Sequence, residues 1–198
     1  STECPLIGDL NGCCMKKKCD RNYFKKKHFL KEVEAICNEN KIVFILDEMI
    51  TGFRWHLKGA QHFYGINPDL STFGKAMANG FSVAAIGGKR KIMELGSITN
   101  KKQERVFLLS TTHGAEMSGL GAFVKTVDFL RKNKVIEKIW NYGSRMIADV
   151  NNISQDLNII NNFKFQGIAC SPYYICLDKN YKPNLKLKTI FVKEMLKN

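Results

Sequence analysis

Residues 41–48 read KIVFILDE, and this stretch decides how the chain around it folds. The run from Lys41 to Leu46 is continuously apolar after its first residue, which is typical of a strand buried on both faces, as in a parallel sheet. Asp47 and Glu48 follow at once, at the strand end from which open α/β sheets present functional groups. A buried carboxylate there needs a cation or a donor, because an unpaired buried charge is costly. The ordinary alternative for such an aspartate is a helix or turn cap.

Outward from this strand, helical and extended patterns alternate along the chain. Helical spacing predicts helices over residues 24–39, 116–132, 135–157 and 187–197. Short apolar runs predict strands over residues 70–73, 83–86 and 106–110, and two more within 163–177 that are joined by a turn at Ser171-Pro172. Asn79-Gly80 is a turn signal. The alternation predicts an α/β domain, with a β-rich part that begins near residue 160.

The composition narrows the class of protein. Hydrophobic residues make up 44% of the 198 residues and charged residues 25%, values that exclude wholesale disorder and fibrous structure. No apolar run approaches the roughly 18 residues of a membrane span, and no signal peptide opens the chain. We therefore expect a cytoplasmic protein with no membrane partner. The missing initial Met leads us to expect a processed or excised chain.

The net charge of +13 raises the question of a nucleic-acid partner. The densest basic block, residues 16–31, holds eight basic residues and one acid, and the remaining excess is spread thinly. No aromatic and basic stacking pattern or helix-turn-helix signature accompanies the charge. We therefore predict no nucleic-acid partner and attribute the excess to a lysine- and asparagine-rich composition.

Four of the seven cysteines lie among the first twenty residues, at positions 4, 13, 14 and 19. Their spacing fits no familiar zinc pattern, which pairs two short Cys spacings. We predict no metal site and expect reduced thiols, with a redox role as the alternative. Cys37, Cys170 and Cys176 lie in apolar contexts and are expected in the core.

Two further segments carry chemical groups. Lys75 lies in STFGKAMANG (residues 71–80), where its small and apolar neighbours suit a desolvated amine with a lowered pKa. The alternative is an ordinary surface lysine. Residues 110–114, STTHG, precede a predicted helix, so that their hydroxyls and amides suit either an anion site or a plain N-cap.

The order and spacing of several motifs resemble those of the class III aminotransferases, and within them glutamate-1-semialdehyde aminomutase and its polysaccharide-associated relatives. The resemblance implies a fold type I α/β enzyme, a transferase or isomerase, that uses pyridoxal 5′-phosphate (PLP). It further implies a small substrate bearing an amino or carbonyl group, and a homodimer. The segments that carry the resemblance are DEMITGFR (47–54), GAQ (59–61), YG (64–65), PDL (68–70), STFGK (71–75) and VAAIGG (83–88).

The resemblance also implies roles for four residues. Lys75 matches the lysine that binds the cofactor covalently and then moves protons between cofactor and substrate. Asp47 matches the carboxylate that pairs with the pyridinium nitrogen, and Met49 the apolar residue beneath the ring. Thr112 matches the threonine that binds the cofactor phosphate across a dimer interface; a one-residue slip would make it Thr111. Glu48 is expected to be structural.

The family comparison implies three parts. They are a Cys-rich irregular segment (1–23), part of the PLP-binding large domain (24–133), and a connecting helix with the beginning of a smaller α+β C-terminal domain (134–198). We expect the chain to be the later part of such an enzyme. The alternative is an inactive fragment or a basic binding module that keeps the motif. Transamination and aminomutase chemistry both stay open, since the substrate contacts come from other segments.

Overall fold

The computed structural model describes residues 29–97, 99 and 116–197. Contacts divide these residues into two compact units, one that ends at Ile136 and one that begins at Glu137. The first unit contains the strand that ends at Asp47. In the part of the chain that the structure describes, no helix combines the length and apolar character needed to cross a bilayer.

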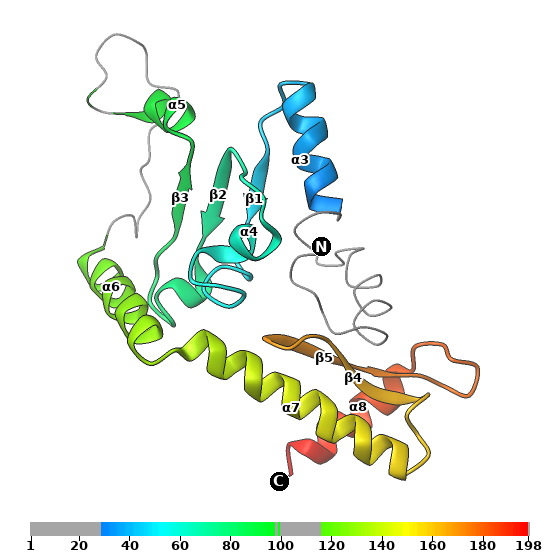
Figure 1. The fold of residues 1–198 in the computed structure, drawn as a ribbon. Coiled ribbons are helices and arrows are strands. Elements are labelled where there is room, and N and C mark those ends of the chain that lie inside the picture. The colour runs from blue at the N-terminus through cyan, green and yellow to red at the C-terminus, as the bar shows by residue number, and fades with distance from the viewer. Residues whose placement is uncertain (1–28, 98, 100–115, 198) are drawn as a thin grey trace. The chain divides into compact units, whose positions relative to one another are not determined.

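The first unit is built on a three-stranded sheet in the order β1-β2-β3. Its strands are β1 (Ile45–Asp47), β2 (Leu70–Phe73) and β3 (Ala85–Gly88), with β2 in the centre (Figure 1). β1 and β2 are parallel, and β3 is antiparallel to β2. The register places Asp47 opposite Thr72 at the carboxyl end of the parallel pair. The predicted strand over 70–73 is confirmed, whereas the one predicted at 83–86 begins two residues later.

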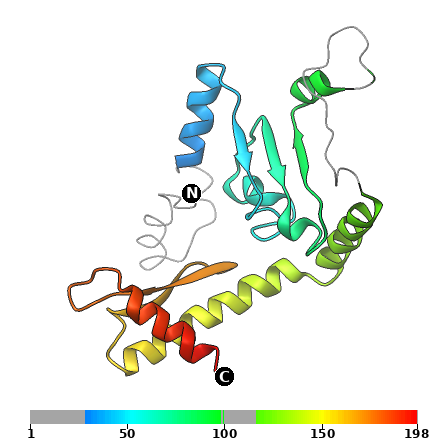
Figure 2. The same ribbon diagram turned by 180° about the vertical axis from the view of Figure 1, so that it is seen from behind.

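The core of this unit lies on one face of the sheet. Helix α4 (Gly59–Tyr64) belongs to the crossover from β1 to β2 and supplies Ala60 and Tyr64 to a buried cluster. Helix α3 (Phe29–Glu39) contributes Leu30 to the same cluster. Figures 1 and 2 both show α3 beside the β1 edge. Phe44, just before β1, and Leu46, within it, pack against this core.

The expectation that the 41–46 run is buried on both faces is wrong. Ile42, Val43 and Ile45 are 54%, 51% and 57% exposed, and the strand itself has only three residues. The physical reason is that α4 covers one face of the strand. In addition, β2 is the only strand paired with β1 among the described residues, so that β1 is an edge strand. The apolar run predicted a strand with both faces buried. Among the described residues, only the face that carries Phe44 and Leu46 is packed.

A short helical turn, η1 (Lys75–Met77), follows β2, and the turn predicted at Asn79-Gly80 is confirmed by positive φ values of 45° and 112°. Helix α6 (Met117–Lys132) packs beside η1 and against the segment before β3. A Cβ on its buried Gly119 would lie 2.7 Å from the Ser82 carbonyl oxygen. The predicted strand over 106–110 lies outside the described residues.

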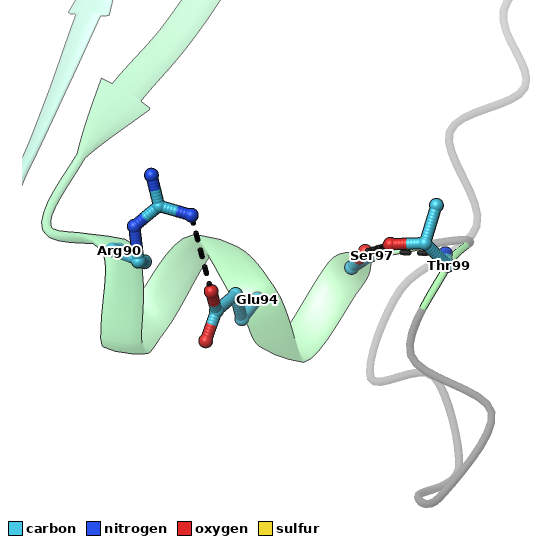
Figure 3. A network of polar contacts seen from close by, with 4 residues as sticks. All are labelled: Arg90, Glu94, Ser97 and Thr99. Carbon is cyan, nitrogen blue, oxygen red and sulfur yellow. Dashed lines mark hydrogen bonds and ion pairs between the residues drawn. The ribbon is translucent and has the colours of Figure 1, made fainter.

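Beyond β3, helix α5 (Arg90–Met93) and the turn η2 (Glu94–Gly96) carry exposed polar contacts. Arg90 and Glu94 form an ion pair of 3.4 Å, and the Ser97 and Thr99 hydroxyls lie 2.8 Å apart (Figure 3). Exposed pairs of this kind contribute about 0–1 kcal/mol. This end of β3 is therefore ordinary solvated surface.

The second unit contains most of helix α7 (Val135–Asp156), the hairpin of β4 (Phe163–Ile168) and β5 (Ser171–Cys176), and helix α8 (Leu185–Met195). Rings of Phe163, Tyr174 and Phe191 pack α8 onto the hairpin. The Asn151 side chain ties α7 to β4 through both backbone groups of Phe165. The turn predicted at Ser171-Pro172 is wrong: it lies at residues 169–170, and Pro172 is in β5, where a two-stranded sheet leaves one side of each strand unpaired.

Candidate active site at the carboxyl ends of β1 and β2

Two of the predicted site residues lie at the same edge of the sheet. Asp47 is the last residue of β1, and Lys75 follows the end of β2 by two residues. Carboxyl ends of adjacent parallel strands meet at one sheet edge, where α/β proteins bind ligands. The positive charge of Lys75 is close enough to contribute to lowering the pKa of Asp47. The geometry therefore joins a carboxylate and an amine that are far apart in the sequence.

The Asp47 carboxylate is held by two donors that use the same oxygen. The backbone N–H of Met49 donates to Oδ1 at 2.9 Å, and the Thr72 hydroxyl donates to Oδ1 at 3.0 Å. These two hydrogen bonds, the Met49 bond first, together with the Lys75 charge hold the pKa of Asp47 below its ordinary value. Among the described residues, no donor reaches Oδ2. Asp47 is thus an exposed, ionised carboxylate with one oxygen to which no described residue donates.

Lys75 opens the turn after β2 with a left-handed backbone, φ 43°. A non-glycine residue in this region stores strain of about 1 kcal/mol, and such residues cluster at functional sites. Its side chain is exposed, so the desolvation expected from the sequence is wrong for the described residues. Small and apolar neighbours in the sequence do not cover the amine, since Lys75 lies beyond the end of β2 and is exposed.

Met49 lies directly against the backbone that leads to Lys75. A Cβ added to Gly74 would touch the Met49 methyl group and lie 2.9 Å from its sulfur. Gly74 has an extended backbone, φ −176°, so its lack of a side chain serves this contact rather than an unusual conformation. The thioether, the carboxylate of Asp47 and the amine of Lys75 therefore gather at one strand end.

Glu48 is fully buried and has a structural role, as expected. Its carboxylate accepts hydrogen bonds from the backbone N–H groups of Ala60 and Gln61, each 2.8 Å long, and from the Thr51 hydroxyl. It thereby binds the first turn of α4, whose orphan N–H groups favour an anion. Gly59 leaves room for it, because a Cβ there would lie 2.8 Å from Cδ of Glu48. This anchor fixes the chain that leaves β1 next to the site.

The sequence by itself did not single out Thr72, and the role predicted for Thr112 stays a prediction. Thr72 was seen only as part of the STFGK motif, since its hydroxyl acquires a partner through the register of β2 against β1. Strand pairing is the only signal that would have found it. Thr112 lies outside the described residues, as does Thr111.

A pocket of about 330 Å³ lies elsewhere and contains none of the predicted site residues. Ser71 and Phe73 line it, whereas Thr72 between them faces Asp47. Alternate residues of a strand point to opposite faces, so the pocket and the site lie on different sides of β2. The Lys89 ammonium at its rim is engaged by Asp69 at 2.7 Å. The chemistry that the sequence indicates is at the strand ends, not in this pocket.

Fold and site together define an open α/β sheet that carries its functional groups at a strand end. The model of the class-III aminotransferase family matches residues 22–186, and the chain belongs to this family. The α/β fold type I expected from the sequence is confirmed by the solved structures that it resembles.

The relatives include enzymes of more than one reaction. The chain is 38% identical over 160 residues to glutamate-1-semialdehyde 2,1-aminomutase of Methanococcoides burtonii, an alignment that covers 80% of this chain and 36% of that protein. It is 31% identical to 3-aminobutyryl-CoA aminotransferase of Cloacimonas acidaminovorans, with coverages of 87% and 40%. The chain thus spans a little over a third of the length of these relatives.

Among solved structures, the PLP internal aldimine form of the FumI protein of Sphingopyxis sp. MTA144 superposes with a TM-score of 0.65. Sequence identity is 23%, and the alignment covers 76% of this chain and 34% of that protein. At this identity the likeness concerns the fold.

Proposed function

We propose that the site of Asp47, Met49 and Lys75 binds PLP and that the protein, at its full natural length, transfers amino groups. The observation that carries this proposal is the Asp47 carboxylate, ionised and held at Oδ1 while Oδ2 stays available, at the same sheet edge as the Lys75 amine. A lone aspartate cap would not require a lysine just beyond the end of the neighbouring parallel strand. The pair supplies an acceptor for a ring N–H and a nucleophilic amine.

The residues present fit the cofactor. When bound, PLP supplies an electron sink for charge that develops at the substrate Cα. Asp47 accepts the hydrogen bond of the ring nitrogen and keeps the proton on it, because a carboxylate with a lowered pKa does not take that proton itself. Lys75 would hold the cofactor through its Nζ amine and would carry protons to and from the substrate Cα. Met49 offers an apolar surface beside both.

The class of substrate follows from what the family members share. An aminomutase and an aminotransferase both appear among the relatives. Both reactions need an amine and a carbonyl group to exchange places, between two molecules or within one. We propose the shared chemistry, amino-group transfer on a small substrate that carries an amino or carbonyl group, for the protein at its full natural length.

Reductive trapping tests the site directly. The protein is loaded with PLP, reduced with borohydride and digested, and the labelled peptide is identified by mass spectrometry. We expect the pyridoxyl group on Lys75, loss of the label in Lys75→Ala, and full labelling in the control Lys91→Ala, which removes an exposed lysine of α5. A label on a different lysine, or none in the wild type, contradicts the proposal.

We further propose that two copies form a homodimer in which Thr112 of each copy binds the phosphate of the other copy's cofactor. Support comes from α6, which follows Thr112 in the chain and exposes Met117 (81%), Leu120 (39%) and Val124 (57%). Exposed apolar side chains in such numbers on one helix favour a protein interface.

Sedimentation at micromolar concentration tests the dimer, and titration of PLP tests Thr112. We expect Thr112→Ala to weaken PLP binding by about 1–3 kcal/mol, the loss of a hydrogen bond to a charged group. The neighbouring Thr111→Ala serves as the control for a one-residue slip. A monomer that binds PLP tightly contradicts the shared site.

A further inference from the structure

We infer that Thr72 is a positioning residue that fixes which oxygen of Asp47 faces the cofactor nitrogen. The inference rests on the proposed function, because it assigns a role within the same site. Thr72 does not touch the cofactor in this scheme. It acts through the Asp47 carboxylate, whose orientation decides whether the ring N–H finds an acceptor.

The geometry concentrates both donors on one oxygen. The Met49 N–H and the Thr72 hydroxyl reach Oδ1 from different elements, the turn after β1 and the centre of β2. A single donor lets a carboxylate swing about that bond, whereas two donors from separate elements define its plane. Because Oδ1 already accepts two hydrogen bonds, Oδ2 is the oxygen that is left to accept one from a ligand.

The position of Thr72 is set by the sheet rather than by its own loop. β2 is the central strand, and Thr72 is paired with Asp47 on one side and with Ile86 of β3 on the other. A slip by one residue would bring Ser71 or Phe73 opposite Asp47, with the side chain on the other face. Pairing on both sides therefore holds the hydroxyl where Oδ1 needs it.

The hydrogen bond from Thr72 also lowers the pKa of Asp47. The Thr72 bond is the second-largest favourable contribution to the lowered pKa of Asp47, after the Met49 N–H and ahead of the Lys75 charge. Removing the hydroxyl therefore raises the pKa of Asp47 toward its ordinary value and frees the carboxylate to turn. The freedom to turn weakens its bond to a pyridinium N–H, because the acceptor oxygen is no longer fixed in place.

The test compares three variants of the protein at its full natural length. Thr72→Val removes the hydroxyl and keeps the β-branched shape that a strand favours, so the fold is preserved. Thr72→Ser restores the hydroxyl. Thr189→Val is the control, since it makes the same change on an exposed position of α8 in the other unit. The readouts are the Asp47 carboxyl titration by NMR in the PLP-free protein, and PLP affinity.

We expect Thr72→Val to raise the Asp47 pKa and to weaken PLP binding about five- to tenfold, less than the loss of a direct hydrogen bond to a charged group, because Thr72 acts only through Asp47. Thr72→Ser and Thr189→Val should behave like the wild type. The inference is overturned if Thr72→Val leaves either readout unchanged, or if Thr72→Ser fails to restore both. If wild-type protein binds no PLP, the proposed function fails and the inference fails with it; an unchanged Asp47 titration defeats the inference alone.

Discussion

The two ends of the β1–β2 pair each carry an aspartate, and the two are used differently. At the amino end, both oxygens of Asp69 have partners within the chain. Oδ1 pairs with the Lys89 ammonium at 2.7 Å, and Oδ2 accepts a hydrogen bond from the Phe44 N–H at 2.8 Å. At the carboxyl end, only Oδ1 of Asp47 accepts hydrogen bonds from the described residues. Both have a lowered pKa, Asp69 mainly through the Lys89 bond and Asp47 mainly through the Met49 N–H.

The difference separates a carboxylate that holds the fold from one that is prepared for a ligand. Glu48, next to Asp47 in the sequence, belongs with Asp69, because both of its oxygens are bound within the chain. Lowered pKa values alone do not distinguish the two classes. The number of carboxylate oxygens that have partners within the chain distinguishes the two classes. Substitution of each carboxylate tests this distinction.

The largest expected effect is on stability, from Glu48→Ala. The change leaves the N–H groups of Ala60 and Gln61 and the Thr51 hydroxyl without their acceptor beside a buried site. At about 1–3 kcal/mol for each unsatisfied group, the free energy of unfolding should fall by about 4 kcal/mol or more. Denaturant unfolding measures it. A loss below about 1 kcal/mol would mean that Glu48 does not anchor α4.

Asp47→Asn should do the opposite, with little effect on stability and a large one on activity. The asparagine oxygen can still accept from Met49 and Thr72, but an NH₂ group replaces Oδ2, and the ring nitrogen loses its acceptor. We expect kcat/KM to fall on the order of a hundredfold, about 2.7 kcal/mol, with unfolding changed by less than about 1 kcal/mol. Steady-state kinetics with denaturant unfolding checks both. Unchanged turnover rules out the role of Asp47.

Asp69→Asn should have an intermediate effect that depends on pH. At neutral pH we expect a loss of about 1–2 kcal/mol, moderated because the partner Lys89 is partly solvated. The folded pKa of Asp69 lies below its ordinary 3.8, so its contribution is present above pH 3.8 and disappears as the pH falls through the folded pKa.

The wild type and the Asp69→Asn variant should therefore converge in stability on acidification. Chemical unfolding at neutral pH and at several values below 3.8 measures the gap. A gap that stays constant across this range would show that the carboxylate charge of Asp69 contributes nothing to the fold.

The smallest effect on stability is expected from Gly74→Ala. The new Cβ comes too close only to the flexible end of Met49, since the Val83 carbonyl oxygen lies at an ordinary contact distance of 3.7 Å, and the extended conformation of Gly74 suits alanine. Unfolding should change by less than about 1 kcal/mol, whereas PLP affinity falls severalfold as the thioether is displaced. Thermal unfolding and PLP titration separate the two. A large loss of stability with unchanged PLP affinity would place Met49 in the fold rather than in the site.

Much of the fold was predictable because it is local. Helical periodicity predicted α6 and α7 to within about a residue, and an apolar run predicted β2. The family resemblance selected Asp47, Met49 and Lys75, and the structure brings them to one strand end. Their roles toward a cofactor stay proposals. The errors also have local causes: exposure of Ile45 and of Lys75 depends on what covers them, which a sequence window does not contain.

By itself the sequence determined the order of the elements, the family and the candidate residues, because apolar periodicity, turn residues and motif spacing act over a few neighbours. Only the tertiary structure decided how the carboxylates are used. The bonds of Asp47 to Thr72 and of Asp69 to Phe44 each join residues 25 positions apart, and Glu48 reaches Ala60 across 12. Those partners are set by strand register and by the docking of α4, since a hydrogen bond needs groups within about 3 Å whatever their distance in sequence.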